Sequence, residues 1–174
     1  QVLSRQTTTP ADIIRQDVFT LSVDHGRSPN NGDYAYMVIP SADPLSIEKQ
    51  VEEEGVVILA NCPEVQAVRH DGLNMAYAAF YKGGMLRIHD KIVVEMDSPG
   101  MLMVKYNDAG EILALGVSDP TRFMKKLHLS VNQKIVGAVQ ENIQTEWDEK
   151  QALTRISVDL PQNEYAGKSV IYNK

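Results

Sequence analysis

The stretch 101–120, "MLMVKYNDAGEILALGVSDP", decides the fold, because two apolar runs flank a short polar turn. The turn is Asn107-Asp108-Ala109-Gly110, and Asn, Asp and Gly tolerate the backbone angles that tight turns require. Two apolar runs on either side of such a turn predict a β-hairpin. We therefore predict a pair of antiparallel strands at this point of the chain.

The same alternation of apolar runs and turns continues on both sides of this hairpin, with turns about every 8–15 residues. The turns are HDG (70–72), KGG (82–84), SPG (98–100), SDP (118–120) and PQNEYAG (161–167). This spacing favours an antiparallel sandwich or barrel over β-α-β units. We predict an all-β protein, in which residues 55–174 form an antiparallel β-sandwich of roughly eight strands. The polar segment 144–150, which contains Trp147, is predicted to be turn-like.

A separate hairpin is predicted near the start of the chain. Residues 17–26, "DVFTLSVDHG", alternate apolar and polar side chains, and residues 28–33, "SPNNGD", have the composition of a turn. Residues 34–40, "YAYMVIP", read as the second strand, which Pro40 ends because it has no N–H to donate. Two strands are not stable alone. They pack onto the second part of the chain, or they belong to a sheet of a preceding domain.

One short linker helix is predicted between the hairpin and the sandwich. Ser41 or Asp43 can cap its start, Pro44 suits its first turn and Gly55 can close it. The predicted organisation is strands of one domain in 1–40, a linker helix in 41–54 and a β-sandwich domain in 55–174. Because the chain starts at Gln1, we expect it to be part of a longer protein.

The composition excludes several classes of partner. The chain has 174 residues and a net charge of −6, which argues against nucleic acid or an anionic membrane as the main partner. No apolar run approaches the ~18 residues of a membrane span. Cys62 is the single cysteine, so no internal disulfide forms, and we expect its thiol to be buried and inert.

Several polar clusters are candidates for chemistry. His25 with Tyr34, Tyr36 and a neighbouring Asp resembles an acid–base cluster, but alternation favours turn and half-buried strand residues instead. The pairs His70-Asp71 and His89-Asp90 read as turns, because a metal site needs further converging ligands. We therefore assign no catalytic, cofactor-binding or metal-binding residue.

Two sets of side chains are candidates for weak sugar contact. Sugars stack on exposed aromatic rings, and basic groups pair with carboxylate or sulfate. The candidates are Tyr77 and Tyr81 on the aromatic side, with Arg122 and Lys126 on the basic side. The alternative is that the aromatic residues belong to the core and the basic residues are merely solvated.

Three motifs together resemble the end of polysaccharide lyase family 8, the chondroitin, hyaluronan and xanthan lyases. They lie in 23–40, 56–72 and 115–122. The matching positions are His25, Gly26, Pro29, Tyr34, Tyr36 and Pro40, then Gln66, Ala67 and Val68, then Asp119, Pro120 and Thr121. The resemblance covers most of the chain in the right order, and residues after about 125 add little to it.

The resemblance implies a role for each part of the chain. Family members combine a helical toroid, a central β-sandwich and a smaller C-terminal β-sandwich. Residues 1–40 would be the last strands of the central sandwich. The family breaks the bond to a uronic acid by β-elimination, with catalytic residues upstream of the region that this chain resembles. The resemblance thus implies a non-catalytic accessory module of a secreted or periplasmic lyase, without a cofactor, whose partners are the upstream domains and, through the parent, the polysaccharide.

Two alternatives stay open. A stand-alone carbohydrate-binding module requires exposed, coplanar aromatic residues, so burial of Tyr77 and Tyr81 would argue against it. A protein-interaction sandwich predicts a large exposed apolar patch away from the hairpin. The accessory module predicts an exposed apolar patch on the hairpin itself.

Overall fold

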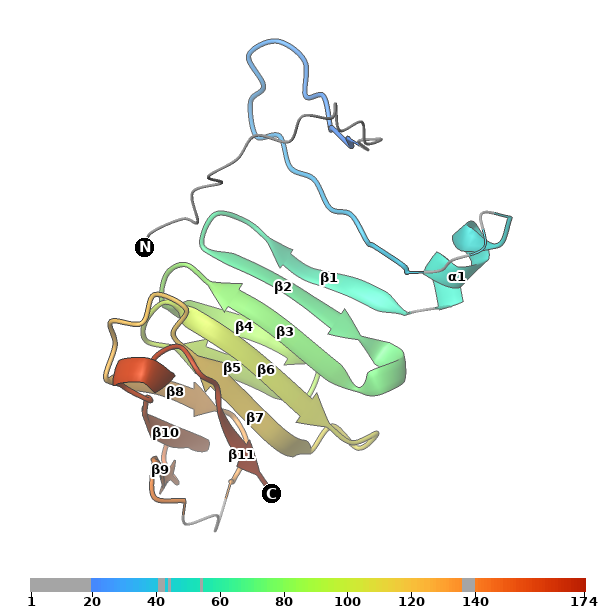
Figure 1. Ribbon diagram of the computed structural model, residues 1–174. Helices are drawn as coiled ribbons and strands as arrows, with labels where there is room; N and C mark the ends of the chain where they lie inside the picture. Colours follow the sequence, from blue (N-terminus) through green and yellow to red (C-terminus); the bar gives the residue numbers. More distant parts are fainter. Residues whose placement is uncertain (1–19, 41–42, 44, 54, 136–139) are drawn as a thin grey trace, which may run out of the picture. The chain divides into compact units, whose positions relative to one another are not determined.

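The computed structural model describes residues 20–40, 43, 45–53, 55–135 and 140–174 (Figure 1). The chain divides into two units, residues 1–38 and 39–174. Predictions that concern residues 1–19 or 136–139 lie outside the described residues.

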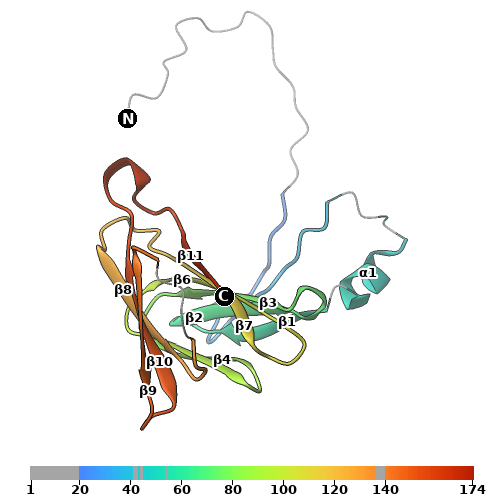
Figure 2. The same cartoon turned by 90° about the horizontal axis from the view of Figure 1, so that it is seen from below.

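The second unit contains a sandwich of two antiparallel sheets, which Figure 2 shows as separate layers. The six-stranded sheet has the order β1 (Val56–Asn61), β2 (Val65–His70), β3 (Met75–Phe80), β6 (Gly100–Tyr106), β7 (Ile112–Ser118) and β11 (Val170–Asn173). The five-stranded sheet has the order β4 (Gly84–His89), β5 (Ile92–Met96), β8 (Lys126–Val131), β10 (Leu153–Asp159) and β9 (Ile143–Asp148). The predicted all-β sandwich is confirmed, with more strands than the roughly eight expected.

The core lies between the two sheets, where every second residue of a strand points inward. On β6, for example, Leu102 and Val104 are buried while Met101 and Lys105 are exposed. Among the largest fully buried side chains are Ile88, Ile92, Val94, Val104 and Leu127. The sandwich therefore rests on apolar side chains that two-residue periodicity assigns to the inner faces.

The predicted hairpin at 101–120 is confirmed as β6 and β7. The Asn107 side chain accepts a hydrogen bond from the Glu111 N–H at 2.9 Å and donates one to Glu111 Oε2 at 3.0 Å. Gly110 adopts φ +76°, which favours glycine. The stretch 85–96 forms a second hairpin, and His89-Asp90 lies at the turn between β4 and β5, as the sequence predicts.

The turn-like prediction for 144–150 is wrong for its first part, because β9 runs from Ile143 to Asp148. β9 is an edge strand, so it needs few apolar residues, and its outer positions Gln144 and Glu146 face solvent. Trp147 is half-buried, and the Lys134 ammonium lies 5.8 Å from its ring centroid. Because its outer positions are polar, the sequence of β9 indicates a turn instead of a strand.

The short helix is confirmed as α1, which spans Ile47–Glu53. Of the predicted range 41–54, residues 41, 42, 44 and 54 lie outside the described residues, and with them the predicted Ser41 cap and Pro44. Asp43 forms the preceding turn by accepting hydrogen bonds from the Leu45 and Ser46 N–H groups, and Gly55 follows the helix at φ +61°. Ile47 and Val51 of this helix are exposed.

The predicted hairpin spans 17–40, of which residues 17–19 lie outside the described residues, and the structure assigns no strand within 20–40. The physical reason is that two strands bury too little apolar surface unless a further layer covers them. Leu21, Val23, Tyr34, Tyr36 and Val38 are all exposed. Residues 20–40 thus have a strand-like sequence without an assigned strand.

We expect Ile88→Ala on β4 to lower the free energy of unfolding by about 2–5 kcal/mol, because it leaves a cavity in the core. Met85→Ala on the same strand is the matched control, since Met85 is exposed, and should change it by less than about 0.5 kcal/mol. Urea unfolding followed by circular dichroism measures both. Equal losses in the two variants would contradict the assignment of inner and outer faces.

Candidate functional site

The four predicted sugar-contact residues lie on three different parts of the sandwich. Tyr77 and Tyr81 share the outer side of the six-stranded sheet and are 43% and 59% exposed. Tyr81 donates a hydrogen bond from its hydroxyl to Gln66 Oε1 at 3.2 Å. Lys126 points outward from the five-stranded sheet and pairs with Asp159 Oδ1 at 2.8 Å. Arg122 lies in the loop between β7 and β8, so the structure does not bring the four together.

The outer face of the six-stranded sheet has an apolar central row, flanked by polar side chains such as Gln66 and Lys105. One cross-strand row crosses all six strands, each residue directly opposite the next. The row is Ile58, Val68, Tyr77, Met103, Gly116 and Ile171. Four of these side chains are large and exposed, and Met101 extends the surface. We call this surface the apolar face; its size and continuity are typical of an interaction surface.

The outer face of the five-stranded sheet is polar. The corresponding row runs across β4, β5, β8, β10 and β9 through Met85, Glu95, Ser130, Arg155 and Glu146. A hollow of about 630 Å³ on this side is lined by polar groups and includes the carboxylates of Glu95, Asp97 and Glu146. The two outer faces of one sandwich therefore have opposite chemistry.

The loop after β7 is organised by one buried carboxylate. Asp119 Oδ1 accepts hydrogen bonds from the Thr121 N–H at 2.9 Å and hydroxyl at 2.6 Å. Its Oδ2 accepts from the N–H groups of Phe123 at 2.9 Å and Met124 at 2.8 Å. Burial raises the pKa of Asp119, but the hydrogen bonds from Thr121, Met124 and Phe123 outweigh it and hold this pKa below its ordinary value.

A second loop packs against the first. The Gln162 side-chain amide donates to the backbone carbonyls of Met124, at 3.0 Å, and Leu160, at 3.0 Å. Gly167, at φ +89°, lies so close that a Cβ there would stand 3.1 Å from Cγ of Arg122. The loop between β10 and β11, residues 160–169, is thus fixed to the loop 119–125.

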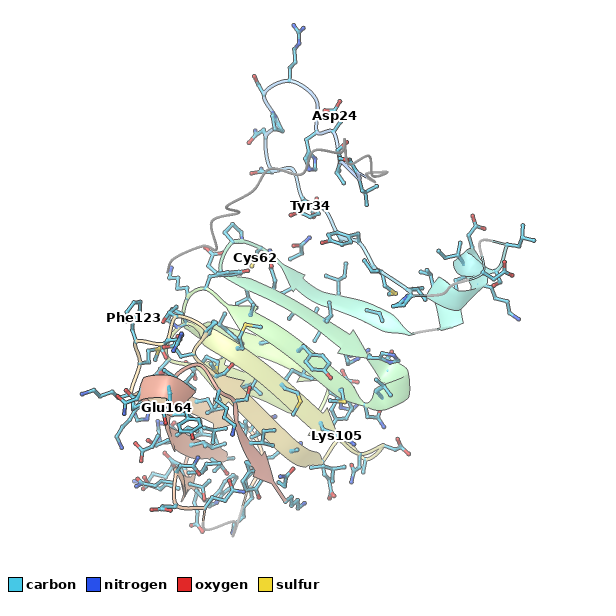
Figure 3. All side chains as sticks on the ribbon, in the orientation of Figure 1. Asp24, Tyr34, Cys62, Lys105, Phe123 and Glu164 are labelled. Carbon is cyan, nitrogen blue, oxygen red and sulfur yellow. The ribbon has the colours of Figure 1, made fainter. Side chains whose placement is uncertain are left out.

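These two loops expose residues that sequence reasoning missed. Phe123 is 88% exposed and Tyr165, in the 3₁₀ helix Asn163–Tyr165, is 60% exposed. Figure 3 shows Phe123 and Glu164 at the same end of the sandwich, away from Lys105. Phe123 lies next to Arg122 in the sequence, but only the tertiary contact between the loops associates it with Tyr165.

The His-Asp pairs serve local structure. Asp71 forms an ion pair with Arg69 whose Nε–Oδ1 distance is 2.5 Å, and the hydrogen bond from Arg69 lowers the pKa of Asp71. His89 Nδ1 accepts from the Lys91 N–H at 3.3 Å, and its ring lies 5.5 Å from that of Tyr106. Among the described residues, no three His, Cys, Asp or Glu side chains are grouped to hold a metal ion.

The predicted cluster of His25, Tyr34, Tyr36 and a neighbouring Asp, in the first unit, is held in part by local contacts. Asp24 Oδ1 accepts a hydrogen bond from the Gly26 N–H at 2.7 Å. The rings of Tyr34 and Tyr36 are stacked 6.4 Å apart, so they share one side as alternation predicts, and His25 lies 6.3 Å from Tyr34. These three rings line a hollow of about 460 Å³ together with Leu21 and Val23.

Cys62 differs from expectation, because it is exposed instead of buried. It occupies the tight connection between β1 and β2, where its backbone N–H donates to the Val65 carbonyl at 3.0 Å. A residue in the connection between two strands lies at the end of its sheet, where the second sheet does not cover it. Within the described part of the chain, no helix is both long and apolar enough to cross a membrane.

Comparison with known proteins gives one consistent family. Residues 57–128 match the family described as "Polysaccharide lyase family 8, C-terminal beta-sandwich domain". The chain is 30% identical to a chondroitinase-AC of Pedobacter heparinus over 91% of its length and 20% of that protein. It is 26% identical to a hyaluronate lyase of Thermasporomyces composti over 91% of its length and 19% of that protein.

The structural comparison agrees with the sequence comparison. A solved chondroitinase AC lyase, studied in oligosaccharide complexes, superposes with a TM-score of 0.55 at 30% identity, over 75% of this chain and 17% of that one. The chain spans about one fifth of the length of the chondroitinase-AC and the hyaluronate lyase named above.

We expect Asp119→Asn to destabilise the protein by about 1–3 kcal/mol at neutral pH, because an amide nitrogen would face N–H donors. Because the pKa of Asp119 is lowered, its contribution is complete above the ordinary value of 3.8 and is lost as pH falls through the lower folded-state pKa. The gap between wild type and variant should therefore narrow in acid.

Chemical unfolding across a pH series measures this gap. Asp90→Asn, in the exposed β4–β5 turn, is the control and should follow the wild type at each pH. A gap for Asp119→Asn that stays constant below pH 3.8 would contradict a structural role for the ionised carboxylate.

Proposed function

We propose that this chain, which carries the C-terminal β-sandwich domain of polysaccharide lyase family 8, is an accessory part of a lyase that cleaves uronic-acid-containing polysaccharide. The parent reaction would be β-elimination. A base removes the proton at C5 of the uronic acid, and a neutralising group stabilises the resulting anion. Glycosaminoglycans such as chondroitin sulfate or hyaluronan are the substrate class that the named relatives suggest.

The chain itself is proposed to be non-catalytic. Its buried carboxylate, Asp119, accepts four hydrogen bonds from donors of its own loop. The Asp24 carboxylate accepts a hydrogen bond from the Gly26 N–H. This local bond explains the position of Asp24 without a catalytic contact to His25. An accessory role therefore explains the positions of both carboxylates without assigning either of them to a reaction. The chemistry would lie in the upstream part of the parent.

The contrast between the two outer faces is the observation that carries this proposal. An isolated soluble sandwich has little reason to keep one outer face apolar and the other charged. In our proposal the apolar face, centred on Tyr77, packs against the upstream part of the parent lyase. The polar face, with Glu95, Arg155 and Glu146, meets solvent.

The first unit fits the same proposal. Residues 1–40 would complete a sheet of the preceding sandwich, and 41–54 would link it to the C-terminal domain. Leu21 and Val23, then Tyr34, Tyr36 and Val38, alternate as strand residues do and are exposed. A sheet supplied by the preceding domain would bury them. Since polymeric substrates are cleaved outside the cytoplasm, we also propose that the parent is secreted or periplasmic.

A carbohydrate-binding module is the second candidate, because the aromatic residues that it requires are exposed. Tyr77 and Tyr81 are not buried. Tyr77 lies in an apolar cross-strand row that carries no cation, however, and this favours a domain contact over an anionic sugar. The apolar face also meets the expectation for a protein-interaction sandwich. The accessory module and the protein-interaction sandwich differ in which molecule covers this face.

We expect this chain to form no unsaturated uronate from chondroitin sulfate or hyaluronan, while the longer natural polypeptide forms it readily. Absorbance of the unsaturated product measures both. Turnover by the chain alone that Tyr36→Phe abolishes would contradict the non-catalytic assignment. Absence of turnover by the longer polypeptide on any uronate polymer would contradict the lyase assignment.

We expect Tyr77→Lys to behave differently in the two contexts. In the isolated chain the apolar face is free, so the melting temperature should shift by less than about 2 °C. In the longer polypeptide the lysine would be buried without a partner, which lowers the melting temperature of the domain and its resistance to proteolysis. Differential scanning calorimetry measures both.

His128→Lys on the polar face is the matched control and should be silent in both contexts. Equal behaviour of Tyr77→Lys in the two contexts would argue that no upstream domain covers the apolar face. Loss of a dimer of the isolated chain on Tyr77→Lys would instead identify a second copy as the occupant.

A further inference from the structure

We propose that the loops 119–125 and 160–169 form a platform that contacts an anionic saccharide chain. The platform consists of Arg122, Phe123, Lys125, Tyr165 and Lys168, all exposed. The class of saccharide, a uronate-containing polymer, rests on the proposed function. The site differs from the aromatic set predicted from sequence, because Arg122 is grouped with Phe123 and Tyr165 instead of Tyr77 and Tyr81.

The exposed aromatic rings are the first support. Phe123 is 88% exposed although its backbone is tightly held, since its N–H donates to the buried Asp119 carboxylate at 2.9 Å. Tyr165 is 60% exposed on the adjacent loop. An uncovered ring on a held backbone offers its face to a ligand, and the backbone loses little conformational freedom on binding.

The anchoring of both loops is the second support. Asp119 holds one loop through four hydrogen bonds, and Gln162 ties the other to it through the Met124 carbonyl. Arg122 adopts φ +68° where it passes Gly167. A non-glycine residue in that region is held by its surroundings, so the backbone from which the Arg122 side chain extends has a defined position.

The local charge is the third support. The platform holds three exposed cations, Arg122, Lys125 and Lys168, beside one exposed carboxylate, Glu164, in a chain of net charge −6. Among the described residues these cations have no ion-pair partner. The Lys168 ammonium lies 5.9 Å from the Tyr165 ring centroid, which places aromatic and basic groups together.

This combination fits an acidic sugar polymer. The C–H face of a sugar ring packs on an aromatic ring, while a uronate carboxylate or a sulfate accepts hydrogen bonds from the guanidinium and ammonium groups. The other two surfaces fit it less well. The central row of the apolar face carries no cation. The hollow of the polar face holds three carboxylates, of Glu95, Asp97 and Glu146, against one guanidinium, that of Arg155, which already pairs with Asp148, so its net negative charge disfavours a polyanion.

The test is a titration of this chain with hyaluronan and chondroitin sulfate oligosaccharides, followed by backbone amide NMR shifts and calorimetry. We expect shifts confined to residues 119–125 and 160–169. Phe123→Ala and Arg122→Gln should each weaken binding about fivefold. Added salt should also weaken it, because the contact is partly ionic and exposed. A neutral oligosaccharide of equal length should not bind.

Tyr81→Ala and Arg87→Gln are the matched controls, because both side chains are exposed but lie outside the platform. They should leave the affinity unchanged, and thermal melting confirms that all four variants are folded. Absence of shifts, binding that only Tyr81→Ala weakens, or equal binding of the neutral sugar would each overturn the platform. Lyase activity of the longer polypeptide is measured separately, so a failed titration does not decide the proposed function.

Discussion

The constraint on which the structure depends is the burial of one face of each antiparallel sheet against the other. Every second residue of a strand must be apolar to satisfy it, as Leu102 and Val104 on β6 and Leu127 and Leu129 on β8 are. The register then fixes what the remaining residues can do, because side chains of neighbouring strands are aligned into rows on the outer faces. The core does not dictate the chemistry of those rows. The apolar row through Tyr77 and the polar row through Arg155 are therefore independent features that carry functional information.

The loops extend this logic beyond the sheets. Strand β7 ends at Ser118, and the next residue, Asp119, turns its carboxylate back toward the chain instead of toward solvent. A buried charge is tolerated there because four donors of the same loop surround it. The result is a rigid connection between the two sheets that displays Phe123 and Arg122. In this domain the most polar interior group and the most exposed aromatic ring belong to one local arrangement.

Periodicity and turn chemistry made the sandwich predictable, including the Asn107–Gly110 hairpin and the His89-Asp90 turn. Three features were not predicted from the sequence, each for a physical reason. The edge strand β9 has polar outer positions because it needs an apolar face on one side only. The sequence of 18–40 has strand character, but a strand forms only with neighbours that bury it. The grouping of Arg122 with Tyr165 depends on packing between loops far apart in the chain, which local patterns do not encode.

The pairing of β11 with β7 has a consequence for the order of folding. Val170 and Tyr172 are core residues, and their strand joins one that precedes β8, β9 and β10 in the chain. Local hairpins such as β6–β7 can close quickly, whereas this long-range pairing must wait until the entire second sheet has been synthesised. Until then β7 presents an unpaired edge. A nascent chain is thus most exposed to mispairing at β7 shortly before β11 emerges, and β11 then covers the β7 edge and becomes the edge strand itself.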